Sequence, residues 1–318
     1  MTLEISRREW LVGGTAAIGG SLIGSATARS SEDAQAGAKD EPFGYCLNTS
    51  TIRGPELTIV QKIEIAAEAG YRGLEPWVRE LDQYAKEGGS LKELGKRIRD
   101  AGLSVESAID FSEWIVDDDS RRKKALEAAQ RSMEMVAEIG GKRIAAPPVG
   151  ATKQSDVNLR AAAERYHALL ELGSRAGVVP QVEVWGFSQT LGRLGEAVLV
   201  AIESGHRRAC ILPDVYHLYK GGSNFDGLKL LSGAAFHVFH FNDYPAAPPR
   251  SEMSDAHRVY PGDGIAPLEE IVRTLREIGF RGMLSLELFN REYWKQDPRT
   301  VARTGLEKMR AVVRRSLG

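Results

Sequence analysis

Four side chains that can bind a metal ion stand near the ends of short apolar runs: Glu183, Asp214, His240 and Glu287. A carboxylate within an apolar run is costly to bury unless it is paired, coordinated or protonated. A divalent cation shared by three carboxylates and one imidazole would offset the repulsion between the carboxylates. The pattern therefore predicts one metal centre, provided that the four runs end at the same place in the fold.

The donor atoms of this set limit the choice of metal. Oxygen donors dominate, which favours Mn²⁺ or Mg²⁺, and the imidazole also admits Zn²⁺ or Co²⁺. The residue types do not choose among these four ions. We therefore expect one divalent cation as the cofactor.

The four runs belong to a regular alternation of strands and helices that begins at residue 43. The expected strands are 44–48, 73–76, 104–107, 143–146, 179–185, 209–214, 235–241 and 283–289. The expected helices are 57–69, 91–101, 121–139, 157–176, 191–204, 267–278 and 300–315, with a short helix after residue 214. Several helices end at a glycine that would adopt the left-handed conformation, namely Gly70, Gly102, Gly140, Gly177, Gly205 and Gly279.

Eight strand–helix units in about 275 residues are the number and size expected of a closed (β/α)8 TIM barrel. An open, doubly wound sheet is the alternative, but no glycine-rich fingerprint follows the first strand. We therefore predict an α/β protein with a single TIM-barrel domain over residues 43–318. The strand ends of such a barrel meet at one rim, where active sites of this fold lie. The Pro-rich connection 243–264 is expected to cover the substrate there.

Composition excludes several classes of protein. Lys and Arg number 42 against 43 Asp and Glu, so the net charge of −1 gives no electrostatic reason to expect a nucleic-acid partner. Only two cysteines are present, which excludes a disulfide scaffold. Cys46 and Cys210 fall on strands that are not neighbours in a barrel, so we expect two unpaired thiols.

The N-terminal segment carries the pattern of an export signal. Arg7 and Arg8 precede a mildly apolar stretch, and Ala26-Thr27-Ala28 provides a small-x-small cleavage site. The stretch is shorter than the roughly 18 apolar residues that span a bilayer. We expect a twin-arginine signal peptide over residues 1–28 and a flexible linker over 29–42, with the twin-arginine machinery as a partner. The mature protein would be periplasmic or otherwise exported without a stable membrane span, and an uncleaved anchor is the alternative.

Five short motifs resemble one protein family across residues 43–315. They are Val182-Glu183-Val184-Trp185, Asp214-Val215-Tyr216-His217, His240-Phe241-Asn242-Asp243, Pro261-Gly262-Asp263-Gly264 and Leu286-Glu287. Together they resemble the xylose isomerase-like TIM barrels, in particular the sugar isomerase/epimerase branch with ketose 3-epimerases and inosose dehydratases. The resemblance implies that Glu183, Asp214, His240 and Glu287 hold one divalent metal. It also implies that the two glutamates exchange protons with a substrate carbon from opposite faces, through an enediolate.

The same resemblance suggests residues that contact the substrate. His217 matches a family histidine that touches a substrate oxygen, and a bond to the backbone is its structural alternative. The family arginine after the metal histidine has no counterpart at the usual spacing, so Arg258 is preferred and Arg250 is the other candidate. Glu75 and Asn48 end strands and could reach a sugar hydroxyl, although a salt bridge in the barrel mouth suits Glu75 equally. Trp185 is expected to form a wall for a sugar ring, or else to belong to the core.

The leading hypothesis is an exported, metal-dependent sugar isomerase or epimerase acting on a ketosugar, a sugar acid or a cyclitol. A dehydratase or lyase on an oxidised keto sugar is an alternative, because it begins with the same proton removal. A carbohydrate-binding barrel without turnover is a further alternative. AP endonucleases resemble the fold but need three zinc ions and more histidines, so that function is disfavoured. The family resemblance also makes a homo-oligomer an open possibility.

Overall fold

The computed structural model describes residues 42–54 and 56–318, and Pro42–Gly318 form one compact unit. The expected signal peptide, residues 1–28, and all but the last residue of the expected linker lie outside the described residues. Within the part of the chain that is described, no helix is long and apolar enough to cross a membrane.

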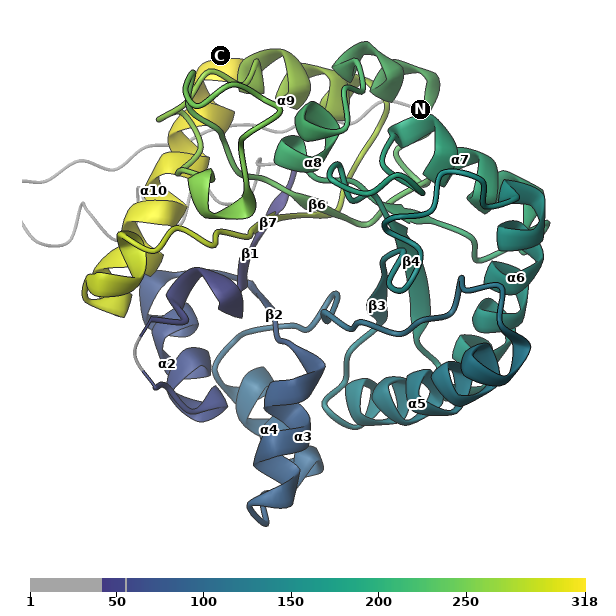
Figure 1. Ribbon diagram of the computed structural model, residues 1–318. Helices are drawn as coiled ribbons and strands as arrows, with labels where there is room; N and C mark the ends of the chain where they lie inside the picture. The colour runs from purple at the N-terminus through teal and green to yellow at the C-terminus, as the bar shows by residue number, and fades with distance from the viewer. Residues whose placement is uncertain (1–41, 55) are drawn as a thin grey trace, which may run out of the picture. The chain divides into compact units, whose positions relative to one another are not determined.

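The strands form the inner ring of the fold, and all of their pairings are parallel (Figure 1). One sheet has the order β2-β1-β7-β6, and the other has the order β3-β4-β5. The strands are β1 Gly44–Asn48, β2 Gly73–Glu75, β3 Arg143–Ala146, β4 Val179–Glu183, β5 Ile211–Leu212, β6 Val238–His240 and β7 Met283–Leu286.

Two sets of bridging contacts join the sheets into a closed barrel. Residues 104–109 lie between β2 and β3, where the Leu74 N–H donates to Ser104 at 2.9 Å and the Ala145 N–H donates to Ala108 at 2.8 Å. Between β5 and β6, Ile211 forms a parallel bridge with Phe236. The predicted (β/α)8 barrel is confirmed. Its third predicted strand, 104–107, is present only as isolated bridges. Ser104 and Ile109 bond to the β2 side, and Val105 and Ala108 bond to the β3 side.

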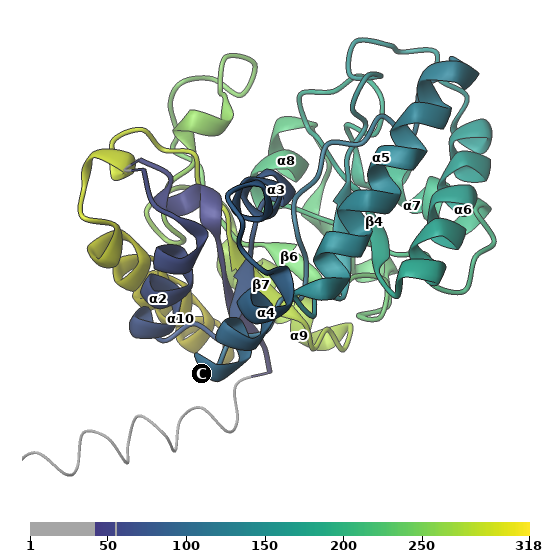
Figure 2. The same ribbon diagram turned by 90° about the horizontal axis from the view of Figure 1, so that it is seen from below.

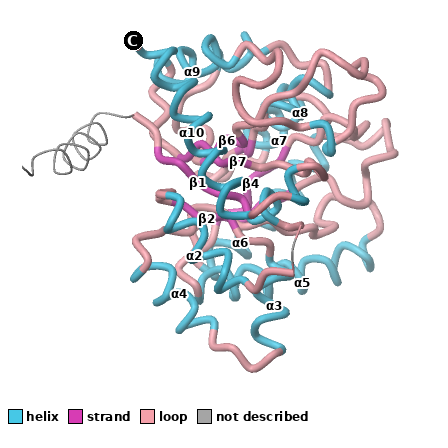
Figure 3. Tube along the Cα trace, turned by 90° about the vertical axis from the view of Figure 1, so that its left-hand side faces the viewer, coloured by secondary structure: helices cyan, strands magenta, loops and turns pink. Residues whose placement is uncertain are grey.

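The helices surround the strands on the outside (Figures 1 and 3), and α10 packs beside α2, which closes the outer ring (Figure 2). They are α2 Ile59–Ala69, α3 Val78–Lys86, α4 Leu91–Asp100, α5 Asp119–Glu138, α6 Leu159–Ala176, α7 Leu194–Glu203, α8 Val215–Lys220, α9 Leu268–Glu277 and α10 Pro298–Leu317. The predicted short helix after residue 214 is α8. Helix α3 was not predicted, and it is separated from α4 by a turn in which Gly88 has a φ of +90°.

Capping side chains explain where the helices begin. Helices α2 and α6 each start two residues later than predicted, because Thr58 accepts the Gln61 N–H and Asn158 accepts the Ala161 N–H. All six glycines predicted to end helices have a positive φ: Gly70, Gly102, Gly140, Gly177, Gly205 and Gly279. Cys46 and Cys210 are buried free thiols, as predicted.

The barrel interior contains a cluster of apolar side chains below a polar rim. Ile109, Ala145, Leu212 and Val238 form a buried apolar cluster with Trp77, and these residues come from five different positions around the ring. Side chains alternate along a strand, so His240 lies on the same face as Val238, two residues earlier. The lumen below the metal-competent groups therefore holds these apolar side chains together with buried polar ones, such as Gln181, which donates to Ser107 at 3.1 Å.

A single carboxylate secures the long connection 243–264. Asp243 accepts the backbone N–H groups of Tyr244, Gly262, Gly264 and Ala266 at 2.8, 2.9, 3.1 and 2.9 Å. The Asp243 N–H also donates to Val259 at 3.1 Å. The two ends of the connection are thereby held together, and the position of Arg258 within it is set.

We predict that Asp243→Asn destabilises the protein by about 1–3 kcal/mol. The substitution replaces one carboxylate oxygen by an N–H₂ group, so the backbone N–H groups that bond to this oxygen lose their acceptor. Thermal or urea unfolding measures the change. Asp263→Asn is the matched control, since Asp263 forms only a surface ion pair with Lys308 and should cost less than about 1 kcal/mol. Equal effects of the two substitutions would contradict this role of Asp243.

Candidate active site

A cavity of about 440 Å³ lies at the carboxyl ends of the strands. Its charged and polar lining consists of Glu183, His217, Ser254, Asp255, Arg258, Glu287 and Arg291. Its remaining walls are mainly aromatic, and they include Trp77, Phe111, Trp185, Phe187, Phe289 and Trp294. Polar, ionisable groups inside an apolar wall are the usual composition of a small-molecule site.

Glu183 is the last residue of β4 and has one oxygen free. Its side chain is buried, and Oε2 has no hydrogen-bond partner. Burial and the neighbouring charge of Glu287 raise the pKa of Glu183 to about 8. In the metal-free protein this carboxylate therefore holds a proton at neutral pH and titrates near the pH at which a general base works best.

His240, the last residue of β6, is held from below by Glu75. Its Nε2 lies 3.0 Å from Glu75 Oε2, while its Nδ1 faces Asp214 and Glu287 at 3.4 and 3.2 Å. Burial opposes the charged imidazole, but the charges of Glu287 and Glu75 outweigh it and raise the pKa of His240 well above its usual value. A carboxylate behind a histidine that points its other nitrogen into a site is the usual support of a metal-binding histidine.

Glu75 is occupied by hydrogen bonds to other side chains of the protein. Its Oε2 accepts from Asn48, His240 and Ser285 at 2.9, 3.0 and 2.7 Å. Burial works against the charged form, yet the charge of His240 and these bonds hold the pKa of Glu75 below its ordinary value. The structure places Glu75 beneath the cavity and not on its lining, where the expected sugar contact would have put it.

Arg258 is fully buried and ties the site together. Its Nη1 donates to Asp214 Oδ2 at 2.8 Å and to Glu287 Oε2 at 2.9 Å. Its Nη2 donates to Asp255 at 2.5 Å, and its guanidinium lies 4.7 Å from the centre of the Tyr216 ring. Arg258, and not the exposed Arg250, is therefore the arginine that the 243–264 connection brings to the site.

Asp214 and Glu287 are the two carboxylates that Arg258 bridges. Asp214 also caps α8, where its Oδ1 accepts the His217 N–H at 2.8 Å. Burial disfavours both anions, but Arg258 keeps the pKa of Asp214 well below its usual range. His240, and after it Arg258, lower the pKa of Glu287. Both carboxylates are therefore ionised.

His217 is neutral, and its proton can be assigned. Arg258 Nη2 lies 2.9 Å from His217 Nε2, and because a guanidinium can only donate, Nε2 must accept and Nδ1 carries the proton. Burial and the adjacent Arg258 lower the pKa of His217. Its buried Nδ1 has no partner within the described residues, so an N–H donor on the cavity lining is left for a ligand oxygen.

The arrangement fits a divalent metal ion. Glu183, His240 and Glu287 each offer one ligand atom within 4.8 Å of the others. Glu183 Oε2 and His240 Nδ1 are buried without a hydrogen-bond partner, as expected of atoms that have another ligand to bind. Asp214, the fourth expected ligand, lies beside His240 Nδ1 and is shared with Arg258.

The remaining expected residues occupy different roles. Asn48 is fully buried and donates to Glu75 and to Glu287 Oε1 at 2.9 and 3.1 Å, so it orients carboxylates from below the cavity. Trp185 is half-buried and lines the cavity.

Sequence reasoning missed several residues that complete the site. Trp77 donates its Nε1–H to Asn48 at 3.0 Å, and Asn242 donates to Asp214 at 3.0 Å. Asn242 stands in a motif that was already noted, His240-Phe241-Asn242-Asp243, which was a usable signal. The exposed rings of Phe111 and Phe187 carry no comparable signal, because nothing in their local sequence separates them from surface aromatics.

The chain was compared with known proteins. The model of the xylose isomerase-like TIM barrel family matches residues 63–312. Inosose isomerase of Bacillus velezensis is 26% identical over 277 residues, which are 84% of this chain and 96% of that protein. 3-Dehydro-D-guloside 4-epimerase of Escherichia coli is 24% identical over 249 residues, which are 72% of this chain and 86% of that protein. The structure of the IolI protein with a bound zinc atom has a TM-score of 0.80 at 22% identity, covering 87% of this chain and 100% of the other. The chain belongs to the xylose isomerase-like TIM barrel family.

Proposed function

We propose that this protein is a metal-dependent isomerase or epimerase of a ketosugar, a sugar acid or a cyclitol. The observation that supports it most is the pair Glu183 and Glu287, which border one cavity and also belong to the candidate metal set. The similar inosose isomerase and 3-dehydro-D-guloside 4-epimerase act, by their names, on substrates of this class. A pure binding protein would have no use for two carboxylates placed to carry protons.

Different surroundings give the two glutamates different tasks. Glu183, with a pKa near 8 in the metal-free protein, is the stronger base. Its carboxylate has two oxygens, so one can take a proton from a C–H next to a carbonyl while Oε2 binds the metal. Glu287 has both oxygens engaged, by Asn48 on one and by Arg258 on the other. In the metal-loaded protein the ionised Glu183 removes the proton. Glu287, which is itself ionised at rest, takes up a proton from solvent and returns it on the other side of the resulting enediolate.

The other groups bind and orient the substrate. His217 presents its Nδ1–H to a substrate oxygen, and Trp185 provides a flat wall for the ring. Glu183, His240 and Glu287, with Asp214 beside them, would hold the divalent metal, and Glu75 would orient His240. When bound, the metal polarises the substrate carbonyl and a neighbouring hydroxyl, which makes the C–H between them acidic.

We predict that the metal-loaded protein exchanges an α-proton of inososes or 3-keto sugars with D₂O, as followed by NMR. Glu183→Gln and Glu287→Gln should each lower the exchange rate by about 10²–10⁴-fold, since neither amide can carry the proton. Glu127→Gln, on the exposed side of α5, is the matched control and should leave the rate unchanged. If no compound of a broad keto-sugar panel exchanges a proton, the proposed function is wrong.

The same assay separates isomerisation from elimination. A dehydratase or lyase would also remove the α-proton, but it would expel a β-hydroxyl as water in place of returning the proton. The product would then be an unsaturated ketone that absorbs in the ultraviolet. Its appearance would replace the isomerase proposal with the lyase alternative.

We predict that divalent metal binding depends on pH in one direction. Glu183 and the charged His240 must each lose a proton to bind a cation. Metal affinity should therefore fall by about tenfold per pH unit for each of the two protons, or about a hundredfold per unit below about pH 8. Titration calorimetry with Mn²⁺ or Zn²⁺ at several pH values measures this slope. Removing the support of His240 with Glu75→Gln should weaken metal affinity by about 10–100-fold.

The metal should also stabilise the fold. At a concentration of about 100 times the dissociation constant it adds about 2.7 kcal/mol to the free energy of unfolding, and chelation removes this gain. An affinity that does not change with pH, or a melting temperature that the metal leaves unchanged, would contradict the assigned ligands.

We also propose that the protein is exported through its twin-arginine segment. The pattern Arg7-Arg8 before an apolar stretch supports this, and the double substitution Arg7→Lys with Arg8→Lys should retain the chain in the cytoplasm. Cell fractionation measures the distribution, with Arg29→Lys as the control. Equal export of both variants would contradict the signal.

A further inference from the structure

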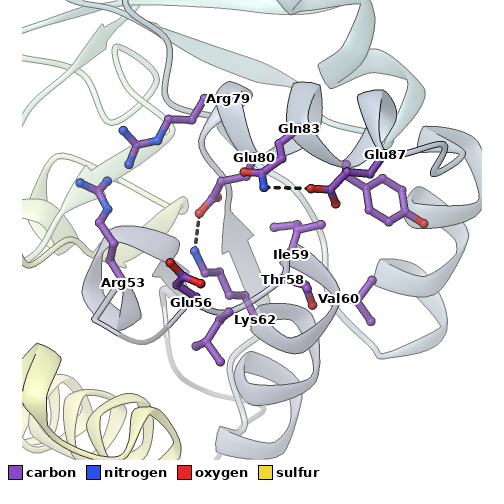
Figure 4. Close-up of a pocket in the computed structure, with 12 residues that line it drawn as sticks. Arg53, Glu56, Thr58, Ile59, Val60, Lys62, Arg79, Glu80, Gln83 and Glu87 are labelled. Atoms are coloured by element: carbon purple, nitrogen blue, oxygen red, sulfur yellow. Dashed lines mark hydrogen bonds and ion pairs between the residues drawn. The ribbon is translucent and has the colours of Figure 1, made fainter.

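A second cavity, of about 690 Å³, lies beside the catalytic one and shares no lining residue with it. It is bounded by the segment after β1, the first turn of α2 and one side of α3 (Figure 4). Its lining is rich in charge, with Arg53, Lys62 and Arg79 as its cations. None of these residues has a part in the proposed proton transfer.

Arg53 and Arg79 converge at one end of this cavity. Figure 4 shows their guanidinium groups turned toward each other, one from the segment after β1 and one from α3. Both guanidinium groups also lie against the Trp77 ring, at 4.2 and 4.4 Å from its centre. Neither arginine has an ion-pair partner among the described residues, and Arg53 Nη2 is buried without a hydrogen bond.

The nearby carboxylates are engaged elsewhere. Glu80 accepts from Lys62 at 2.5 Å, from the Thr49 hydroxyl at 2.6 Å and from the Trp77 N–H at 3.0 Å. Glu87, farther along α3, accepts from Gln83 at 3.0 Å. Glu56 is exposed and forms an ion pair with neither arginine. Among the described residues, therefore, no carboxylate contact balances the charges of the two arginines.

The positive charges of Arg53 and Arg79 repel each other, and the attraction of the Trp77 ring offsets only part of this repulsion. A ring face attracts a guanidinium but offers no oxygen acceptor to its N–H groups. Burial, and then the charge of Arg79, lower the pKa of Arg53, so its surroundings oppose its own charge. Helix α2 adds the positive end of its dipole, since Thr58, Ile59 and Val60 line the same cavity. The group that completes this arrangement is an anion with several oxygens.

We propose that Arg53 and Arg79 form an oxyanion-binding site for a phosphate or carboxylate group. A guanidinium pair suits both, because each arginine can donate two parallel hydrogen bonds to such a group. The site adjoins the catalytic cavity through Trp77, which lines that cavity and donates to Asn48, the donor to Glu287. The anion is either a free ion or the acid group of a substrate that extends past Trp77.

Titration calorimetry of the purified full-length protein at low ionic strength, with inorganic phosphate and with acetate, tests the site. We expect binding of at least one of the two anions, weakened about tenfold or more by Arg53→Gln and by Arg79→Gln. Arg79 is exposed, so Arg79→Gln should fold normally. Its affinity therefore tests the site even if Arg53→Gln fails to fold. Arg303→Gln, an exposed arginine of α10, is the matched control for the lost charge and should bind as the wild type does. Equal affinity in all four proteins, or no binding of either anion, would overturn the proposal.

Two further measurements identify the source of the anion. If the site takes the acid group of the substrate, Arg79→Gln raises KM for a keto-sugar acid and leaves KM for the matching neutral sugar unchanged. If it takes a free ion, both values of KM stay as they are while phosphate binding is lost. Glu56→Gln should strengthen anion binding or leave it unchanged. A weaker affinity would show that Glu56 helps to build the site, which would contradict a site formed by the two arginines alone. The calorimetry needs no turnover, so its result is independent of the proposed isomerase activity.

Discussion

The structure depends on the compensation of buried charge at the rim of the barrel. Glu75, Asp214 and Glu287 are ionised there, within reach of two cations, His240 and Arg258. Burial alone would make each of these charges costly, and removing one partner would leave its counterpart uncompensated. Glu183, which forms no ion pair with any other described residue, keeps its proton instead. A divalent cation would change this balance most at Glu183 and His240, the two members of the metal set that are protonated without it.

The fold provides this compensation through the carboxyl ends of different strands. The groups Asn48, Glu75, Glu183 and His240 end β1, β2, β4 and β6, and Asp214 and Glu287 follow β5 and β7. Alternation along β6 places His240 above the part of the lumen that Val238 helps to fill. Arg258 arrives from outside the strands, on a connection that Asp243 holds by four backbone hydrogen bonds. The candidate catalytic groups are therefore held by the strands, and the guanidinium of Arg258 is held by a loop that Asp243 fixes.

Local features of this protein could be predicted from its sequence, whereas contacts between distant residues could not. The barrel, the six glycines that end helices and the unpaired cysteines were predicted correctly, because periodicity and turn chemistry are local properties. For Glu75 the structure shows the salt bridge that was one of the two expectations, with His240 at 3.0 Å. The contacts of Asn48 were not predicted, because a side chain at a strand end can point to a ligand or to a neighbour below it. Here Asn48 contacts Glu287, 239 residues away in the chain. The third predicted strand forms only isolated bridges for a similar reason. Its hydrogen bonds depend on where the neighbouring strands lie in the barrel, which its own residues do not record.

The sequence by itself determined which residues stand at the strand ends and that their types suit a metal ion and proton transfer. Tertiary structure alone decided how they share charge. Arg258 bridges Asp214 and Glu287, which leaves Glu183 with a free oxygen, while Arg53 and Arg79 meet at Trp77 without a carboxylate. The physical reason is that a pKa or an unpaired charge depends on distances of a few ångströms between groups. Such distances are set by how distant segments pack, and no local pattern in a sequence records them.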